Sequence, residues 1–334
     1  MTRLDIKDKF SGCIIGQAVG DALGFIAEGH SPENCEAYVN RVLDENNEFP
    51  FKRGPYPLGQ YSDDTQLARE LMLSIVQCKA FNPEDYAVRI ANIFAENRIV
   101  GWGLATREAA ERLIAGISWR ESGEPFPSAG NGSAMRAAPI GLLYYNQPNL
   151  IIKSAIDQSI ITHSDPRCCA GSVAIAGATA LVLQLDNLNA NKFLDQLAAW
   201  TEAIDVTVSE GLQALQDWLD LPPGEAVHYV ANYGYQSGYE NDWHGISPYV
   251  ISSVLWSLYA FLKIPDDYLE SIRISIAVGG DVDTTGAMTG AISGAFNGIS
   301  SIPGRYVKLL NDCGSWNHSE LADLAGRLYE LAAC

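Results

Sequence analysis

Cationic residues are scarce in this sequence. Its 334 residues include 22 Lys and Arg against 40 Asp and Glu, which gives a formal net charge of −18 at pH 7. A nucleic-acid surface needs clustered Lys and Arg to neutralise phosphates, and an anionic membrane leaflet attracts the same residues. The charge balance therefore argues against nucleic acid and membranes as partners. A small anionic ligand is compatible with this charge balance, because its binding needs only local hydrogen-bond donors or metal ions.

Targeting segments and paired cysteines are also lacking. Residues 1–9 contain no apolar core of a secretory leader. The most apolar stretch, around residues 249–262, is shorter than the roughly 20 residues that span a bilayer. No CxxC pair occurs among the cysteines, which are Cys13, Cys35, Cys78, Cys168, Cys169, Cys313 and Cys334. This pattern is typical of free thiols in a reducing compartment, so we expect a cytoplasmic protein.

Alternating β-branched runs, the pattern of half-buried strands, are almost absent. Apolar residues instead recur at helical spacing, as in Leu67-Leu71-Ile75, Tyr86-Ile90-Ile93 and Leu321-Leu324-Leu328. Pairs such as Asn82-Pro83 and Asp165-Pro166 separate these segments as helix caps do. No linker or low-complexity tract marks a boundary. The sequence predicts an all-α fold, a compact helical bundle of about a dozen helices in a single domain over residues 1–334.

Two segments carry glycine at every fourth position. The first has Gly12, Gly16, Gly20 and Gly24, and the second has Gly286, Gly290, Gly294 and Gly298. Residues four apart lie on one face of a helix, and each glycine costs a helix about 1 kcal/mol relative to alanine. We therefore expect two helices whose glycine faces allow close backbone approach in a crowded core. A loop with repeated glycine is the alternative.

Three aspartates stand alone in uncharged, apolar segments. Asp21 is the only charged residue of segment 10–27, and Asp281 and Asp283 are the only ones of segment 274–304. A carboxylate in an apolar interior costs several kcal/mol unless it is paired or ligated, and neighbouring carboxylates raise each other's pKa. A hard divalent cation, Mg²⁺ or Mn²⁺, favours such oxygen ligands. The pattern therefore predicts a metal beside these side chains.

A second acidic cluster, Ser62-Asp63-Asp64-Thr65, precedes a helical pattern. Ser62 could cap that helix, and the helix dipole favours acids in the first turn, so an ordinary structural interpretation is available. Together with residues 281–284 the cluster supplies four carboxylates and several hydroxyls, enough for a two-metal site. The histidines and cysteines lack the spacing of a zinc site.

Two polar loops are candidates for ligand contact. Segment 130–136, Gly-Asn-Gly-Ser-Ala-Met-Arg, precedes an apolar helical run. Such a turn can present backbone N–H groups to an anion, although a plain helix cap is an equal alternative. Residues 162–166, Thr-His-Ser-Asp-Pro, form an elbow between helical segments. His163 there could cap a helix, lie buried in a hydrogen bond, or contact a ligand.

Taken in order, these segments resemble the ADP-ribosylglycohydrolase family. The matching stretches are 16–24 with Glu28, then 62–65, 130–136, Thr162-His163 and 279–286. Each stretch is short, but five in the family's order are specific, and they span most of the chain. The resemblance implies an all-α fold around a binuclear Mg²⁺ or Mn²⁺ centre. It also implies hydrolysis of the bond between ADP-ribose and an acceptor side chain.

The resemblance further implies roles for individual residues. The metal ligands would be Ser62, Asp63, Asp64, Asp281, Asp283 and Thr284. The substrate-binding residues would be Asn131, Gly132, Ser133, Ala134, Met135 and His163. Asp63 or Glu28 would be the catalytic general base, and the sequence does not choose between them. Ser62 stands where the family often has Thr, which keeps the hydroxyl.

The acceptor and the partners are further expectations. By analogy with bacterial relatives the leaving group is an arginine guanidinium, with serine or a free nucleotide derivative as alternatives. The substrate would be an ADP-ribosylated protein, and ADP-ribose the product. The aromatic, glycine-rich segment 232–248 could shape the acceptor end, or its aromatic residues could simply pack within the loop.

Three other functions are compatible with parts of the sequence. One is a catalytically weak or inactive ADP-ribose binder of the same fold. Another is an immunity-type protein that blocks an ADP-ribosyltransferase toxin by direct contact. The third is a haloacid-dehalogenase-type phosphatase, because Asp281-Val282-Asp283-Thr284-Thr285 fits a DxDxT motif. The phosphatase needs a strand at residues 272–278.

Overall fold

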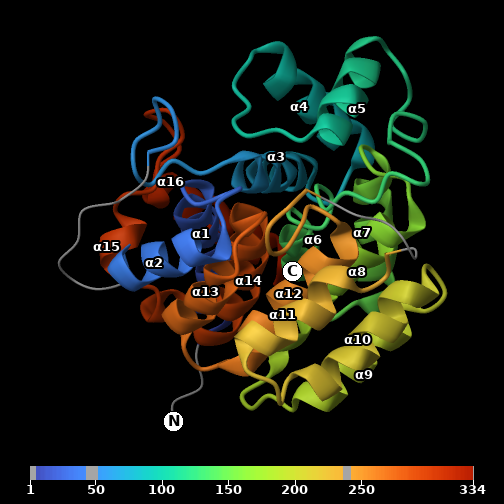
Figure 1. Ribbon diagram of the computed structural model, residues 1–334. Helices are drawn as coiled ribbons and strands as arrows, with labels where there is room; N and C mark the ends of the chain where they lie inside the picture. Colours follow the sequence, from blue (N-terminus) through green and yellow to red (C-terminus); the bar gives the residue numbers. More distant parts are fainter. Residues whose placement is uncertain (1–4, 43–51, 236–241, 334) are drawn as a thin grey trace.

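The computed structural model describes residues 5–42, 52–235 and 242–333 (Figure 1). Within these ranges the chain forms sixteen α-helices and one 3-10 helix, and it has isolated bridges but no strands. The all-α prediction is confirmed, with more helices than the dozen expected. The elements are α1 (Ile6–Phe25), α2 (Pro32–Val42), α3 (Asp63–Cys78), α4 (Pro83–Ala95), α5 (Leu104–Ile114), α6 (Ala138–Leu143), α7 (Pro148–Ile160), α8 (Pro166–Gln184), α9 (Ala190–Thr201), α10 (Val206–Trp218), α11 (Pro223–Asn232), α12 (Val250–Lys263), α13 (Tyr268–Ala277), α14 (Val282–Asn297), η1 (Ile299–Ser301), α15 (Gly304–Val307) and α16 (His318–Ala332).

Helices α1 and α14 pack side by side in the core (Figure 1). They run antiparallel, and their glycine faces lie against each other. A Cβ atom placed on Gly16 would lie 2.3 Å from the carbonyl oxygen of Gly290. One placed on Gly20 would lie 2.0 Å from that of Gly286. Both helices are therefore confirmed, and close backbone contact is the reason for their glycines. Gly298 differs from the rest, because it follows α14 with a φ of 74° and ends that helix.

The same contact brings the ends of the two helices together. A Cβ on Gly24, near the C-terminal end of α1, would lie 2.2 Å from the carbonyl oxygen of Val282, the first residue of α14. Just beyond α1, the N–H of Gly29 donates to the carbonyl oxygen of Gly280 at 2.9 Å. The turn that holds Glu28 therefore lies beside the start of α14.

Asp21 joins α1 to the start of α3. Its carboxylate accepts hydrogen bonds from the N–H groups of Ser62 (2.9 Å) and Thr65 (3.0 Å) and from the Thr65 hydroxyl (2.6 Å). Burial raises the pKa of Asp21 to about 6, and these hydrogen bonds oppose the rise. The sequence predicts a metal beside this lone carboxylate. The structure instead compensates it with donors from the N-terminal end of a helix, which favours an anion.

Helix caps follow the sequence at several positions. Ser62 is the N-cap of α3, where its hydroxyl accepts from the N–H of Asp64 at 3.3 Å. Asn82 and Asp165 cap α4 and α8 as predicted. The interpretation of the first acidic cluster as the capped start of a helix is therefore confirmed, because Asp63 and Asp64 occupy the first turn of α3.

Helix α8 has the length and apolar composition of a membrane span, and 83% of its most apolar window is buried inside the fold. It packs against α6, α7, α9, α12 and α14. Its apolar surface is therefore accounted for by the core. The apolar residues 249–262 lie in the shorter helix α12 and its N-cap, and the expectation from the sequence overlooks the longer helix α8, in which Ala and Gly separate the larger apolar residues.

Residues 272–278 are helical rather than extended. They lie in α13 and its C-cap, Val278. The phosphatase alternative needs a strand here, followed by a sheet, and the described part of the chain contains no strand. That alternative is therefore excluded.

Replacing Gly20 by alanine tests the contact between α1 and α14. The new methyl group would overlap the carbonyl oxygen of Gly286 and force two backbones apart. We expect the free energy of unfolding to fall by about 3 kcal/mol. Denaturant unfolding followed by circular dichroism measures the change.

Gly326→Ala in α16 is the matched control. Its Cβ would meet nothing nearer than a methylene of Lys7 at 3.9 Å. Because alanine has the higher helix propensity, this substitution should raise the stability by up to about 1 kcal/mol. If both substitutions had the same effect, the glycine face of α1 would have no special packing role.

Candidate functional site

A pocket of about 350 Å³ lies where the starts of α3 and α14 meet the turn after α1. Loops before α5, before α6 and before α12 complete its walls. The lining residues are Glu28, Asp63, Asp64, Gly101, Trp102, Gly103, Leu104, Ala105, Thr106, Gly130, Asn131, Gly132, Met135, His163, Trp243, Pro248, Asp281, Asp283 and Thr284. Both acidic clusters, the glycine loop and His163 thus meet in one cavity, although long stretches of sequence separate them.

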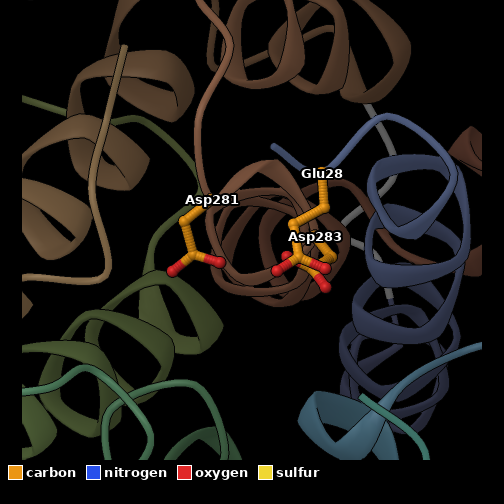
Figure 2. Close-up of side chains that lie close together, drawn as sticks. All are labelled: Glu28, Asp281 and Asp283. Carbon is orange, nitrogen blue, oxygen red and sulfur yellow. The ribbon is translucent and has the colours of Figure 1, made fainter. Parts of the chain in front are cut away.

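Three acidic side chains converge in this pocket (Figure 2). One carboxylate oxygen from each of Glu28, Asp281 and Asp283 lies within 4.8 Å of the other two. The two aspartates come from the N-terminal end of α14, and Glu28 comes from the turn after α1. Carboxylate oxygens at this spacing suit a hard divalent cation.

Asp64 links the two acidic clusters. Its Oδ2 atom accepts hydrogen bonds from the hydroxyls of Ser62 (2.9 Å) and Thr284 (3.4 Å). Its Oδ1 atom is buried and has no hydrogen-bond partner among the described residues. Such an oxygen costs free energy unless a donor or a cation meets it. The donor set, all oxygen and partly unpartnered, therefore fits a Mg²⁺ or Mn²⁺ site.

The electrostatics of the pocket also favour positive charge. Burial, together with repulsion between the carboxylates, raises the pKa values of Asp63, Asp64 and Asp283 well above their usual range. Burial and the neighbouring Asp283 raise the pKa of Glu28 to about 8, and burial raises that of Asp281 to about 6. Cations bound among these groups would remove the repulsion and keep the carboxylates ionised at neutral pH.

Arg53 lies at the edge of the acidic group. It forms an ion pair with Glu28 and donates to the carbonyl oxygen of Phe25 at 2.8 Å. Its guanidinium lies 4.1 Å from the centre of the Phe25 ring, which holds it in place. Its charge opposes the rise in the pKa of Asp283. A single guanidinium cannot neutralise five carboxylates, so the acidic group still requires further positive charge.

The side chain of Asn131 is hydrogen-bonded to the carboxylate of Asp281. Its side-chain amide donates to Asp281 Oδ2 at 2.5 Å and to the Ser253 hydroxyl at 2.9 Å. Its backbone N–H donates to the carbonyl oxygen of Pro248 at 3.0 Å. The predicted substrate contact of Asn131 therefore has to coexist with a role in orienting a candidate metal ligand.

Several groups of the glycine loop are hydrogen-bonded within the protein. The N–H groups of Ala134 and Met135 both donate to the carbonyl oxygen of Asn131, whereas those of Gly132 and Ser133 have no backbone acceptor among the described residues. The Ser133 hydroxyl accepts a hydrogen bond from the Ser159 hydroxyl at 2.8 Å. Ser133 and Ala134 are fully buried and do not line the cavity, and neither does Ser62. Their ligand roles stay predictions.

His163 lies in the wall of the pocket against the glycine loop. A Cβ on Gly132 would lie 2.7 Å from its Cε1 atom, so glycine is needed beside the ring. Burial, and then the charge of Arg136, lower the pKa of His163 to about 3. The imidazole is therefore neutral at physiological pH and can donate one hydrogen bond.

Segment 101–106, a short loop and the first turn of α5, is a part of the site that the sequence does not mark. Gly101 has a φ of 75°, and a Cβ there would lie 3.6 Å from Asp63 Oδ1, so the loop passes close to the first acidic cluster. Trp102 and Leu104 follow at the rim, 43% and 64% exposed. The Gly-Trp-Gly triplet is the one visible signal, and it does not reveal what the loop faces.

The predicted acceptor segment, 232–248, is only partly described. Residues 236–241 lie outside the described residues. Trp243 and Pro248 line the pocket, which agrees with a role of this segment at one end of the cavity. Tyr235 stacks on Tyr249, with ring centres 4.4 Å apart, so part of its aromatic content packs within the loop.

Comparison with known proteins identifies several relatives of this chain along most of its length. The sequence is 31% identical to an uncharacterized protein of Archaeoglobus fulgidus over 98% of this chain and 97% of the relative. It is 28% identical to the human ADP-ribosylhydrolase ARH3 over 88% of this chain and 87% of the relative. It is 26% identical to the ADP-ribosylarginine hydrolase Tri1 of Pseudomonas putida over 98% of this chain and 81% of the relative.

A solved structure and a family model agree with these relatives. An ADP-ribosylglycohydrolase-related protein complex has a chain that matches with a TM-score of 0.71 and 27% identity, covering 98% of this chain and 99% of that one. The family model for ADP-ribosylglycohydrolase matches residues 2–334. The chain therefore belongs to the ADP-ribosylglycohydrolase family.

Proposed function

We propose that this protein is a Mg²⁺- or Mn²⁺-dependent hydrolase that removes ADP-ribose from a modified arginine side chain. The observation that carries the proposal is the pocket itself, in which four buried carboxylates and the partly buried Glu28 face a glycine loop and a neutral histidine. Membership of a family of hydrolases that act on the glycosidic bonds of ADP-ribose supports the reaction class. The name of the Pseudomonas putida relative supports arginine as the acceptor.

Two cations would be held by the side chains of both acidic clusters. The candidate ligands that line the pocket are Asp63, Asp64, Asp281, Asp283, Thr284 and Glu28. Ser62, which is also a predicted ligand, does not line the pocket, and its hydroxyl donates to Asp64 Oδ2. When bound, the cations would offset the negative charge of these groups and polarise oxygen atoms of the ribose and of a water molecule.

Hydrolysis needs a base for the attacking water, and Asp63 and Glu28 are the two candidates. Both line the pocket, and either would take the water's proton on a carboxylate oxygen. Glu28 is held by Arg53, which limits where its carboxylate can reach. As the bond to the acceptor breaks, positive charge develops on the ribose, and the remaining carboxylates would stabilise it.

The opposite wall of the pocket would bind the rest of ADP-ribose. The N–H group of Gly132, which lines the pocket and has no backbone acceptor among the described residues, is the loop donor available to an anion, and His163 offers a second donor from its ring. Since these donors carry no net charge, they can hold a diphosphate in a protein of net charge −18 without a cluster of lysines.

The acceptor is tested by offering the protein several ADP-ribosylated substrates. Proteins modified on arginine, serine or cysteine would each be incubated with it and Mg²⁺, and released ADP-ribose measured by mass spectrometry. We expect release from arginine. Release only from serine would correct the acceptor, whereas tight binding of ADP-ribose without release from any substrate would favour the binder or the toxin-blocking immunity protein.

Asp63→Asn tests the acidic cluster. It keeps the shape of the side chain but removes its charge, so we expect turnover to fall by about 100-fold or more while the fold is retained. Asp267→Asn is the matched control, because Asp267 caps α13 on the surface and asparagine also serves as a cap. Near-normal turnover of the Asp63 variant would refute its role.

The raised pKa values predict how metal and pH act on stability. An acid whose pKa is higher in the folded state stabilises the fold at low pH, and this contribution is lost as pH rises through the folded value. Between about pH 4, where these acids titrate in an unfolded chain, and about pH 8, the value for Glu28, the metal-free protein should lose stability as pH rises.

Thermal unfolding with a chelator and with excess Mg²⁺ or Mn²⁺ measures this effect. Bound cations keep the carboxylates ionised, so the gap in melting temperature between the two conditions should widen from pH 5 to pH 8. A gap that stays constant over this range would show that the buried acids are not the groups that bind the metal.

A further inference from the structure

A hydrogen-bonded chain of side chains runs behind the pocket and ends at His163. Arg136 is fully buried and donates from its NH2 nitrogen to the Thr162 hydroxyl oxygen at 2.7 Å. That oxygen lies 2.8 Å from Nδ1 of His163. Neither Arg136 nor Thr162 lines the pocket. Both residues therefore act on a ligand only through the histidine.

The donor and acceptor roles in this chain follow from the chemistry of arginine. A guanidinium has five N–H donors and no acceptor, so the Thr162 oxygen must accept from it. The hydroxyl has one hydrogen of its own, and among the described residues His163 Nδ1 is the one acceptor within reach. If Nδ1 carried the proton instead, that hydrogen would be left buried without a partner, which costs free energy. Thr162 therefore donates to Nδ1.

The other edge of the imidazole faces the glycine loop. A Cβ on Gly130 would lie 3.3 Å from Nε2, and one on Gly132 would lie 3.2 Å from the same atom. Because the ring is neutral and Nδ1 accepts, its single hydrogen is on Nε2. Asp165, which could otherwise draw a second proton to the ring, is already paired with Arg167 at 2.7 Å.

Gln158 fixes Arg136 and ties the chain to the same loop. Its side-chain oxygen accepts from Arg136 Nε at 3.0 Å, and its backbone oxygen accepts from the guanidinium at 3.1 Å. Its side-chain nitrogen donates to the carbonyl oxygen of Ser133 at 2.8 Å. The guanidinium, the glycine loop and the histidine are thus held in one rigid arrangement.

We propose that Arg136 and Thr162 are positioning residues that hold His163 as the Nε2–H tautomer, so that it donates a hydrogen bond to an oxygen of the bound ADP-ribose. The ligand part of this statement rests on the proposed function. The assignment of the tautomer depends only on the hydrogen bonds that link Arg136, Thr162 and His163. Substitution of either residue would thus weaken ligand binding without removing any group that touches the ligand.

Nitrogen NMR of the full-length protein tests the tautomer directly. Long-range ¹H–¹⁵N spectra of histidine-labelled protein distinguish Nδ1–H from Nε2–H rings, and a His163→Gln variant identifies the signal. We expect the Nε2–H pattern in the wild type and in Thr162→Ser, which keeps the hydroxyl. In Thr162→Val the Nδ1–H form should gain population. An Nδ1–H ring in the wild type would overturn the proposal whether or not any variant folds.

Calorimetric titration with ADP-ribose and Mg²⁺ tests the consequence for binding. Loss of one well-oriented hydrogen bond should raise the Kd of Thr162→Val about tenfold, with Thr162→Ser close to the wild type. Thr201→Val is the matched control, because this buried threonine bonds only to the helix carbonyl oxygens of Leu197 and Ala198 and lies in α9. An unchanged Kd in Thr162→Val, or an equal rise in Thr201→Val, would contradict the proposal. A wild type with the Nε2–H ring that does not bind ADP-ribose would refute the proposed function instead.

Discussion

The contact between α1 and α14 is the constraint on which the rest of the structure depends. Along this contact, carbonyl oxygens of one helix fill the space that side chains of the other would need. Neither helix can rotate or slide without collision, because close-packed interiors do not deform continuously. The turn after α1 and the first turn of α14 therefore keep a fixed separation. This separation also keeps the carboxylates of Glu28 and Asp283 close together. Side chains that repel one another need such a frame to stay within reach of a shared ligand.

The buried acids of this frame are compensated in two different ways. Asp21 receives three hydrogen bonds from the start of α3, so its charge is met within the protein. Asp64 receives hydroxyl hydrogens on one oxygen only and leaves the other without a partner. One residue type thus serves as a structural anchor in the first case and as a candidate ligand in the second. A formal charge of −18 therefore overstates the negative charge of the surface, since several of the acids lie inside.

Sequence patterns predict those parts of this molecule that local spacing decides. Glycine every fourth residue, the caps at Ser62 and Asp165, and the two acidic clusters all depend on neighbours a few positions away. What the sequence does not reveal depends on partners distant in sequence. Asp21 looked as isolated as Asp281, because nothing near it shows that the start of α3 covers it. The hydroxyl of Ser133 is likewise held by Ser159, a partner in α7 that the sequence does not reveal. Similarly, segment 101–106 reaches Asp63 only through the tertiary fold.

The pairing of the first helix with one near the end of the chain has a consequence for synthesis on the ribosome. Residues emerge from the N-terminus onward, so α1 is exposed long before α14 exists. Until then its glycine face has no backbone of α14 to cover it, and the ring of Phe10 lacks its contact with Tyr329 of α16. During this time the nascent protein exposes an apolar helix, to which chaperones can bind. A copy terminated before α14 carries neither a closed core nor an assembled pocket, so cleavage chemistry can begin only when translation is nearly complete.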